Sequence, residues 1–470
     1  MKKILSAIIL IAAAAFSLNA QQNLRTAYFL DGYTYGYKMN PAFQGERAFL
    51  AVPVFGKLSM GVESDLGLST FLYPSSDGTL MTFLHPEVSD SDFLAKMKGN
   101  KMMTMNADMP FFALGFRTGK AYHTLDISAR VDGGANLTKD LFHFMKIGSS
   151  DGKDTWDISD FGARAEARME LAYGYSRHFG ENVSVGARVK LLMGMARANV
   201  AMDQMNLKMN GDEWAVAAKG SAEFAGIIDV KTKENNVLDW NTIGLKDGYG
   251  QNGPSIGLAV DLGVSVDLLD DYLTLSASVL DLGSIRWKDV VTASTPSTVW
   301  SFTGFDNVSF DGEGSGMTDQ FSGLADDLSD AMNFIKDSGV SESKSGLSAT
   351  THLGLEARMP FYDRLSVGVL GTHRFAGAYS WTEGRFSINW ALLRFFALSG
   401  SYAISDFGNS LGGAVNIHLP GVTLFAGLDS FLPLMNVTPD FIPIDSWNTN
   451  LSVGLNIAFG KYHGRYPKRK

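Results

Sequence analysis

Charged side chains that alternate with apolar ones are the residues best placed to do chemistry in this sequence. Between 163 and 175, every second side chain is apolar or aromatic, and the positions between them begin Arg164, Glu166, Arg168, Glu170. A period of two indicates a β-strand with two unlike faces. The same parity places a further six charged side chains on the polar face of their segments: Asp126, Arg130, Arg188, Lys190, Glu356 and Arg358. The pattern therefore predicts ten charged side chains on one face of a sheet.

Two functions fit such a face if the sheet closes into a membrane barrel. A Glu or Arg facing lipid near the midplane would cost about 2–4 kcal/mol, so we expect the charges to line the lumen. They can form a salt-bridge lattice that stiffens a filled barrel, or a polar conduit or binding site. Mixed signs at alternate positions favour the lattice, and a barrel of this size can enclose a cavity or be plugged.

Hydropathy distinguishes a barrel from other membrane proteins. The mean hydropathy is +0.01, yet no apolar run after residue 20 approaches the roughly 20 residues of a membrane helix. Strands that span a bilayer need apolar residues only at alternate positions. Residues 256–268 and 451–459 alternate for longer than the roughly five or six residues of an ordinary strand. The expected fold is all-β: a transmembrane antiparallel β-barrel over residues 48–460.

The N-terminus predicts export to the outer membrane. Met1-Lys2-Lys3 is a basic start, Ile4 to Phe16 is apolar, and Ala20 offers a small residue for cleavage. This is the pattern of a signal peptide over residues 1–20, with Gln21 first in the mature chain. The chain has no Cys, which excludes a disulfide scaffold and Cys-based metal sites. Its net charge of −9 argues against nucleic acid as a partner. For an exported membrane barrel, the expected partner is outer-membrane lipid.

Loop lengths predict the orientation and the strand number. Tight turns such as Asp270-Asp271 and Pro420-Gly421 alternate with long connections such as 289–346, which are typical of the periplasmic and extracellular sides respectively. The count is about fourteen strands, or sixteen if 203–252 contains an extra hairpin around Trp214–Phe224. Residues 48–56 are either a strand or part of an inserted segment.

Four other segments lie outside the alternating pattern. Residues 319–336, in the longest loop, have an amphipathic helical period, and Leu137–Met145 is a weaker helix candidate. The basic tail 461–470 is expected in the periplasm. Residues 21–47 are rich in aromatic side chains and too irregular for a strand, so we expect a plug segment that threads into the lumen.

Asn40-Pro41-Ala42, followed by Gly-rich alternating strands, resembles the long-chain fatty-acid transporter (FadL) superfamily. The closing run Leu455–Gly460 and the overall layout are similar to an uncharacterised Bacteroidetes outer-membrane family, catalogued as a domain of unknown function, over nearly the whole mature chain. The resemblance implies a fourteen-stranded barrel with an N-terminal plug, and passage of hydrophobic molecules. It supplies no matched ligand residues.

The sequence gives little support for an enzyme. Gly408-Asn409-Ser410-Leu411-Gly412 matches a nucleophile elbow, but it falls in a turn between strands rather than before a helix. The eight His residues show no metal-ligand spacing, so we expect no metal, no cofactor and no catalytic residue. Two functions remain: a FadL-like channel for small hydrophobic or amphipathic solutes, and a non-transport or secretion-associated scaffold with a plugged lumen.

Overall fold

The computed structural model describes residues 23–463, apart from 54, 76–79, 98, 149–151, 210–213, 251, 297–298, 303–332, 340 and 432–446. The predicted signal peptide lies outside the described residues, as do 319–332 of the predicted loop helix and 464–470 of the basic tail. The final residues of that helix prediction, Ile335–Lys336, form the short strand β17.

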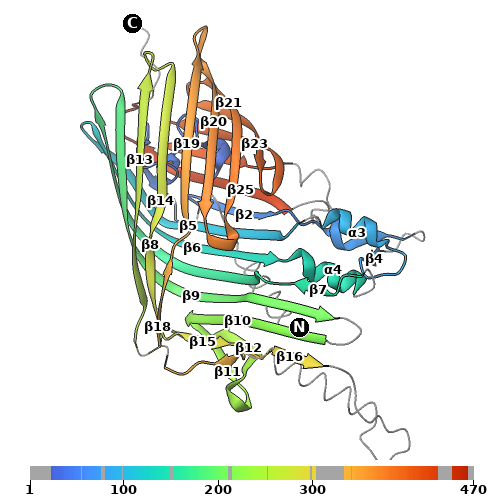
Figure 1. The fold of residues 1–470 in the computed structure, drawn as a ribbon. Coiled ribbons are helices and arrows are strands. Elements are labelled where there is room, and N and C mark those ends of the chain that lie inside the picture. Colours follow the sequence, from blue (N-terminus) through green and yellow to red (C-terminus); the bar gives the residue numbers. More distant parts are fainter. Residues whose placement is uncertain are drawn as a thin grey trace, which may run out of the picture.

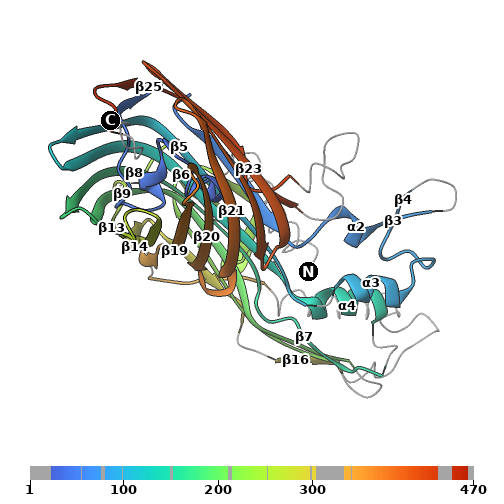
Figure 2. The ribbon, with the colours of Figure 1, turned by 90° about the horizontal axis from the view of Figure 1, so that it is seen from above.

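Antiparallel strands close into a fourteen-stranded barrel (Figures 1 and 2), which confirms the predicted fold class. The first strand is broken into β1 (Ala48–Ala51) and β2 (Leu58–Ser64), and both parts pair with the last strand, β25 (Trp447–Phe459). The other twelve, in order around the wall, are β5 (Lys101–Thr118), β6 (Ala121–Leu137), β8 (Phe161–Phe179), β9 (Val183–Met209), β13 (Ser255–Leu268), β14 (Leu273–Lys288), β19 (Ala349–Met359), β20 (Tyr362–Phe375), β21 (Trp381–Leu393), β22 (Phe396–Ser405), β23 (Gly408–Leu419) and β24 (Val422–Leu428).

The wall is apolar outside and polar inside, because each strand presents alternate residues to opposite faces. On β9, Val189 is 55% exposed while its neighbour Lys190 is 2% exposed. On β21, Ile388 is exposed and Asn389 is buried. A soluble barrel would show the reverse arrangement, so the pattern is that of a barrel that crosses a membrane with its apolar surface toward lipid.

The hairpin suspected within 203–252 exists but adds no strand to the closed wall. The N-terminal half of β9, residues 183–194, pairs with β13. Its C-terminal half, residues 196–209, pairs with β10 (Trp214–Gly226). β9 is 27 residues long, far beyond the roughly nine to eleven needed to cross a bilayer. The β9–β10 hairpin therefore extends past the membrane, and the alternative of sixteen wall strands is wrong.

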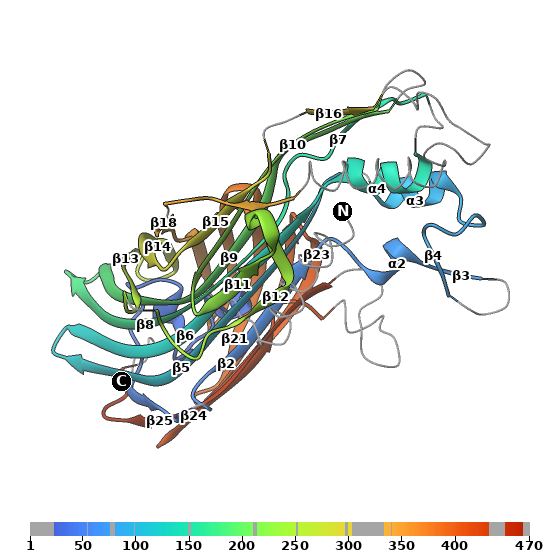
Figure 3. The same cartoon turned by 90° about the horizontal axis from the view of Figure 1, so that it is seen from below.

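Short strands and helices cover the end of the barrel that carries the β9–β10 hairpin (Figure 3). The strands are β3 (Leu72–Pro74), β4 (Leu80–Thr82), β7 (Thr155–Asp157), β11 (Ile228–Thr232), β12 (Leu238–Leu245), β15 (Val291–Ser294), β16 (Val299–Phe302) and β18 (Glu342–Gly346). The α-helices described are α2 (Leu68–Phe71), α3 (Asp90–Lys96) and α4 (Lys139–Ile147), and α4 confirms the weaker helix prediction. Among the described residues, no helix is both long and apolar enough to cross a membrane.

The two ends of the barrel differ as the loop lengths predict. Asp270-Asp271 and Pro420-Gly421 are tight turns that connect β13 to β14 and β23 to β24. They lie at the end where the C-terminus emerges, opposite α3 and α4 (Figure 1). We call these the tight-turn end and the long-loop end.

Candidate functional site

Residues 23–47, called here the luminal segment, lie inside the barrel (Figure 2). The segment contains the 3-10 turns η1 (Arg25–Ala27) and η2 (Gly36–Lys38), and most of its side chains are buried. Its hydrogen bonds reach β5, β13, β14, β22 and β25. The segment thus contacts the wall around the whole lumen, where the plug was predicted.

Arg25 fixes the start of the luminal segment to the wall. Its guanidinium pairs with Glu63 on β2 and, at 2.9 Å from Nε, with Glu383 on β21. The Asp429 carboxylate, just after β24, accepts hydrogen bonds from the backbone N–H of Arg25 at 3.0 Å and of Thr26 at 2.7 Å. Burial lowers the pKa of Arg25, but the three carboxylates outweigh it and raise the pKa overall, so Arg25 is charged.

Lys38 fixes the middle of the segment to β5 and β6, the two wall strands that follow β2. Its Nζ lies 3.0 Å from Asp108 on β5 and 3.4 Å from Asp126 on β6. Asp108 also pairs with Lys57, which lies in the break of the first strand and donates to Asn23. One carboxylate therefore joins the luminal segment to the interrupted strand.

The Asn40-Pro41-Ala42 motif is held against the backbone of two wall strands. The Asn40 amide donates to the carbonyls of Val264 on β13 and Ala277 on β14, and its Oδ1 accepts from Ala42 N at 2.9 Å. A Cβ on Gly263 would lie 2.1 Å from Asn40 Oδ1, and a Cβ on Gly186 would lie 2.0 Å from the Pro41 carbonyl oxygen. Glycine at both wall positions lets the motif approach this closely.

The charged side chains predicted for the lumen all point inward. Asp126, Arg130, Arg164, Glu166, Arg168, Glu170, Arg188 and Lys190 face the interior of one half of the wall, and Glu356 and Arg358 face a cavity at the tight-turn end. Arg164 donates to the Ala376 carbonyl and to Ser348 and lies over the Tyr379 ring. Seven of the other nine join a single ion-pair network.

That network is continuous through shared carboxylates and guanidinium groups. In order from the luminal segment it links Lys38, Asp126, Arg188, Asp261, Lys190, Asp281, Arg130, Glu170 and Arg168. At Arg168 it branches, through Asp132 to Arg374 and through Glu166 to Arg197 and Glu223. Opposite signs alternate along it. Such an arrangement is compatible with the salt-bridge lattice, one of the two functions considered for the charged face.

Several members of these clusters were not among the predicted residues. Asp132, Asp261, Arg374 and Glu383 follow the same period of two on their strands, so parity applied to every strand could have found them. Asp281 could not be found in this way, because the period on β14 shifts by one residue there and both Leu280 and Asp281 are buried. Arg25, Lys38 and Lys57 lie in irregular backbone, where no sequence period indicates which way a side chain points.

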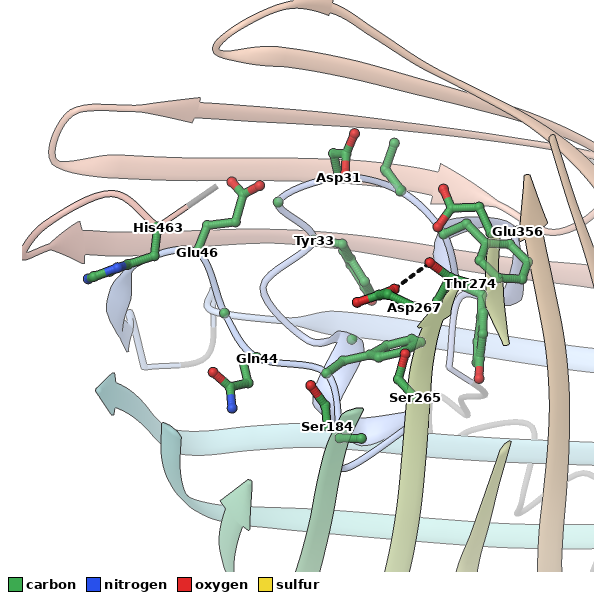
Figure 4. Close-up of a pocket in the computed structure, with 18 of the residues that line it drawn as sticks. Asp31, Tyr33, Gln44, Glu46, Ser184, Ser265, Asp267, Thr274, Glu356 and His463 are labelled. Atoms are coloured by element: carbon green, nitrogen blue, oxygen red, sulfur yellow. Dashed lines mark hydrogen bonds between the residues drawn. The ribbon is translucent and has the colours of Figure 1, made fainter. Parts of the chain in front are cut away.

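A cavity of about 210 Å³ opens at the tight-turn end between the luminal segment and β9, β13, β14 and β19 (Figure 4). We call it the inner chamber. Its aromatic side is Tyr28, Phe29 and Phe43, with ring centroids 4.8 Å apart for Tyr28–Phe29 and 5.1 Å for Tyr28–Phe43. On the wall side, Asp267 accepts from Thr274 at 2.6 Å. The chamber therefore combines an apolar surface with a charged one.

A wider, more open basin of about 530 Å³ lies at the long-loop end. Asp65, Asp160 and Asp406 line it together with Asn100 and Asn136. Asp65 pairs with Lys101 at 3.0 Å. Among the described residues, no group of three or more His, Asp or Glu side chains could hold a metal ion.

Sequence comparison identifies the family. A family model described as "Family of unknown function (DUF5723)" matches residues 41–429. The chain belongs to this family. No curated protein matches the sequence.

The DUF5723 match begins inside the luminal segment, at Pro41, and ends at Asp429. The match therefore includes Asp429, whose carboxylate accepts the hydrogen bond from the Arg25 backbone, but it includes neither Arg25 itself nor β25. The structure shows that both belong to the closed barrel, because β25 pairs with β24 and with the first strand.

Solved structures similar to this DUF5723 chain are outer-membrane-type barrels with low identity. The toluene transporter TbuX of Ralstonia pickettii has 10% identity and a TM-score of 0.44, covering 93% of this chain and 100% of its own. A FadL homologue from Pseudomonas aeruginosa has 11% identity and a TM-score of 0.42, covering 94% and 100%. Because the identities and TM-scores are this low, the evidence for the barrel is the strand pairing observed in this chain.

Proposed function

We propose that this chain is an outer-membrane conduit for small amphipathic solutes, closed by its luminal segment. The observation that carries the proposal is the inner chamber, a solute-sized cavity between the luminal segment and the wall. Sites for drug-sized ligands occupy roughly 300–1,000 Å³, so a cavity of about 210 Å³ suits a single ring with a short substituent. The predicted signal peptide and the wall, with its apolar face outside, support the outer membrane as its location, with the tight-turn end toward the periplasm.

The luminal segment is held by an apolar cluster, in which Tyr33, Tyr35 and Met39 pack with Phe49 and Phe425 on the wall, and by polar contacts that allow it to act as a gate. Arg25, Lys38 and Asn40 attach it through ion pairs and hydrogen bonds, which water can replace when the segment moves. The interruption of the first strand between Ala51 and Leu58 directly follows the segment. Movement of the segment would therefore also affect the adjacent wall.

Efflux from vesicles tests this proposal. The mature chain is reconstituted into lipid vesicles loaded with benzyltrimethylammonium or benzenesulfonate, two amphipathic ions of similar size that cross lipid slowly. We expect efflux above that of empty vesicles, and faster efflux after deletion of residues 21–40, because the deletion removes Arg25 and Lys38. If both ions stay inside even with the deletion variant, the conduit is wrong.

The second candidate is a closed scaffold, which the continuous ion-pair network favours. Such a lattice stiffens the barrel without any passage, and it occupies much of one half of the lumen. The same efflux experiment separates the two functions, because a scaffold retains both probe ions when the luminal segment is deleted.

A further inference from the structure

The charge of the inner chamber indicates which solutes it accepts. Its lining contains five carboxylate side chains but two guanidinium groups: Asp31, Glu46, Asp267, Asp271 and Glu356, against Arg117 and Arg358. Of the two His in the lining, His463 has its pKa lowered, by burial first and then by Arg117 and Lys461, so it adds no positive charge at neutral pH. The formal charge of the lining is therefore negative.

Two of these carboxylates accept hydrogen bonds from neutral hydroxyl groups. Asp267 accepts from the Thr274 hydroxyl, and Glu356 accepts from the Ser366 hydroxyl at 2.7 Å. Neutral hydroxyl donors favour the charged form of a carboxylate. Arg117 donates to the Gln44 side chain and to the Gly45 carbonyl oxygen, so its guanidinium is bound to neutral acceptors at the edge of the chamber.

The aromatic side of the chamber can accept an apolar group beside the carboxylates. Tyr28, Phe29 and Phe43 meet edge to face, and the half-buried Phe43 borders the opening. The face of an aromatic ring carries partial negative charge and attracts ammonium groups within about 6 Å. Phe43 lines the same chamber as Asp267 and Glu356, and Figure 4 shows those two carboxylates. An organic cation with an apolar ring satisfies both sides, because its ring can pack on Phe43 while its charge faces Asp267 and Glu356.

The basin at the long-loop end has the same sign. Its lining includes three aspartates and, within the described part of the chain, neither Lys nor Arg; Asp65 is paired with Lys101 just outside the lining, which leaves Asp160 and Asp406 to give the basin its negative charge. A mouth lined by carboxylates concentrates cations and repels anions. A cation would therefore be favoured at both openings of the barrel.

We infer that the inner chamber is a binding site for small organic cations that carry an apolar group, such as aryl-alkyl ammonium compounds. This inference rests on the proposed conduit and names its substrate class. It departs from a conduit for anionic or uncharged amphiphiles, for which the carboxylates would be repulsive or would stay unused.

Calorimetric titration of the purified mature chain in neutral detergent measures binding separately from passage. We expect benzyltrimethylammonium to bind about tenfold or more tightly than benzenesulfonate. Substitutions D267N and E356Q should each weaken binding of the cation several-fold. The control E181Q removes a carboxylate from the exposed turn between β8 and β9, outside the chamber lining, and should leave the affinity unchanged.

Phe43→Leu provides a second test, because it removes the aromatic ring and keeps the site apolar. It should weaken binding of benzyltrimethylammonium while heat-modifiable migration on gels shows that the barrel is intact. Equal affinity for the two ions, or an affinity for the cation that is unaffected by D267N, E356Q and F43L, overturns the inference. Efflux of benzenesulfonate alone would also overturn it and leave the conduit standing, whereas cation binding without any efflux supports the site and contradicts the conduit.

Discussion

Arg25 illustrates how single residues hold the luminal segment. Its guanidinium is buried with Glu63 and Glu383, and its backbone N–H is bound by Asp429. Removing one partner from a buried ion cluster is costly because the remaining charges lose their compensation. Arg25 is thus the residue whose loss should release the segment from the wall.

Substitution R25M should destabilise docking of the luminal segment by about 3–5 kcal/mol, since it leaves buried carboxylates without their cation. Hydrogen exchange of amides in residues 23–40 should then accelerate by about two to three orders of magnitude. Exchange in β8 and β9 should stay slow. The matched control is R177M, which removes an exposed arginine from β8. Unchanged protection of the segment in R25M would show that Arg25 is not its anchor.

The alternation of residues along each strand predicted which wall side chains point inward, but it did not predict the contacts of the luminal segment. Alternation in residues 163–175 predicted the inward direction of Arg168 and Glu170, because a strand leaves no other choice once one face meets lipid. It could not predict that Lys38 meets Asp108 and Asp126. Those contacts depend on the path of irregular backbone and on strands far apart in the sequence.

At the scale of elements, the luminal segment fits the wall through backbone contact at Gly186 on β9 and Gly263 on β13. Any side chain at these positions would occupy the space of the Asn40-Pro41-Ala42 backbone. The close packing of the motif against the wall therefore depends on the two glycines as much as on the motif itself.

Substitution G186A should displace the motif, because the added Cβ would lie 2.0 Å from the Pro41 carbonyl oxygen. We expect a loss of about 1–3 kcal/mol, the usual cost of overpacking, measured by urea unfolding in detergent. The control G400A adds a methyl group at an exposed position on β22 with nothing within 4 Å. Equal stability of G186A and G400A would contradict the close approach.

Among the elements, long strands and tight turns were predictable, whereas interruptions were not. The turns at Asp270-Asp271 and Pro420-Gly421 follow from local sequence. The break between β1 and β2 does not, because residues 52–57 read as a mixture of strand and loop. Lys57 can be buried there because its ammonium group forms an ion pair with Asp108 and donates a hydrogen bond to Asn23.

At the scale of the whole molecule, closure depends on pairings across the entire chain. β25 meets the first strand, which lies about four hundred residues earlier: Ala48 pairs with Phe459. The number of wall strands was predicted within the range of fourteen to sixteen. The sequence could not exclude the β10 hairpin from the wall, because β10 alternates like a membrane strand and differs in its partners, which are residues 196–209 of β9 and the short strands β15 and β16.

A reversible tether of the luminal segment tests most directly whether that segment closes a conduit. The chain has no Cys, and the Thr26 Oγ1 and Ser401 Oγ atoms lie 2.8 Å apart, so the double variant T26C/S401C can join the segment to β22 by a disulfide. In vesicles loaded with benzyltrimethylammonium, we predict slow efflux when the disulfide is formed and faster efflux after reduction. Efflux that is the same in the oxidised and reduced protein would contradict the gate.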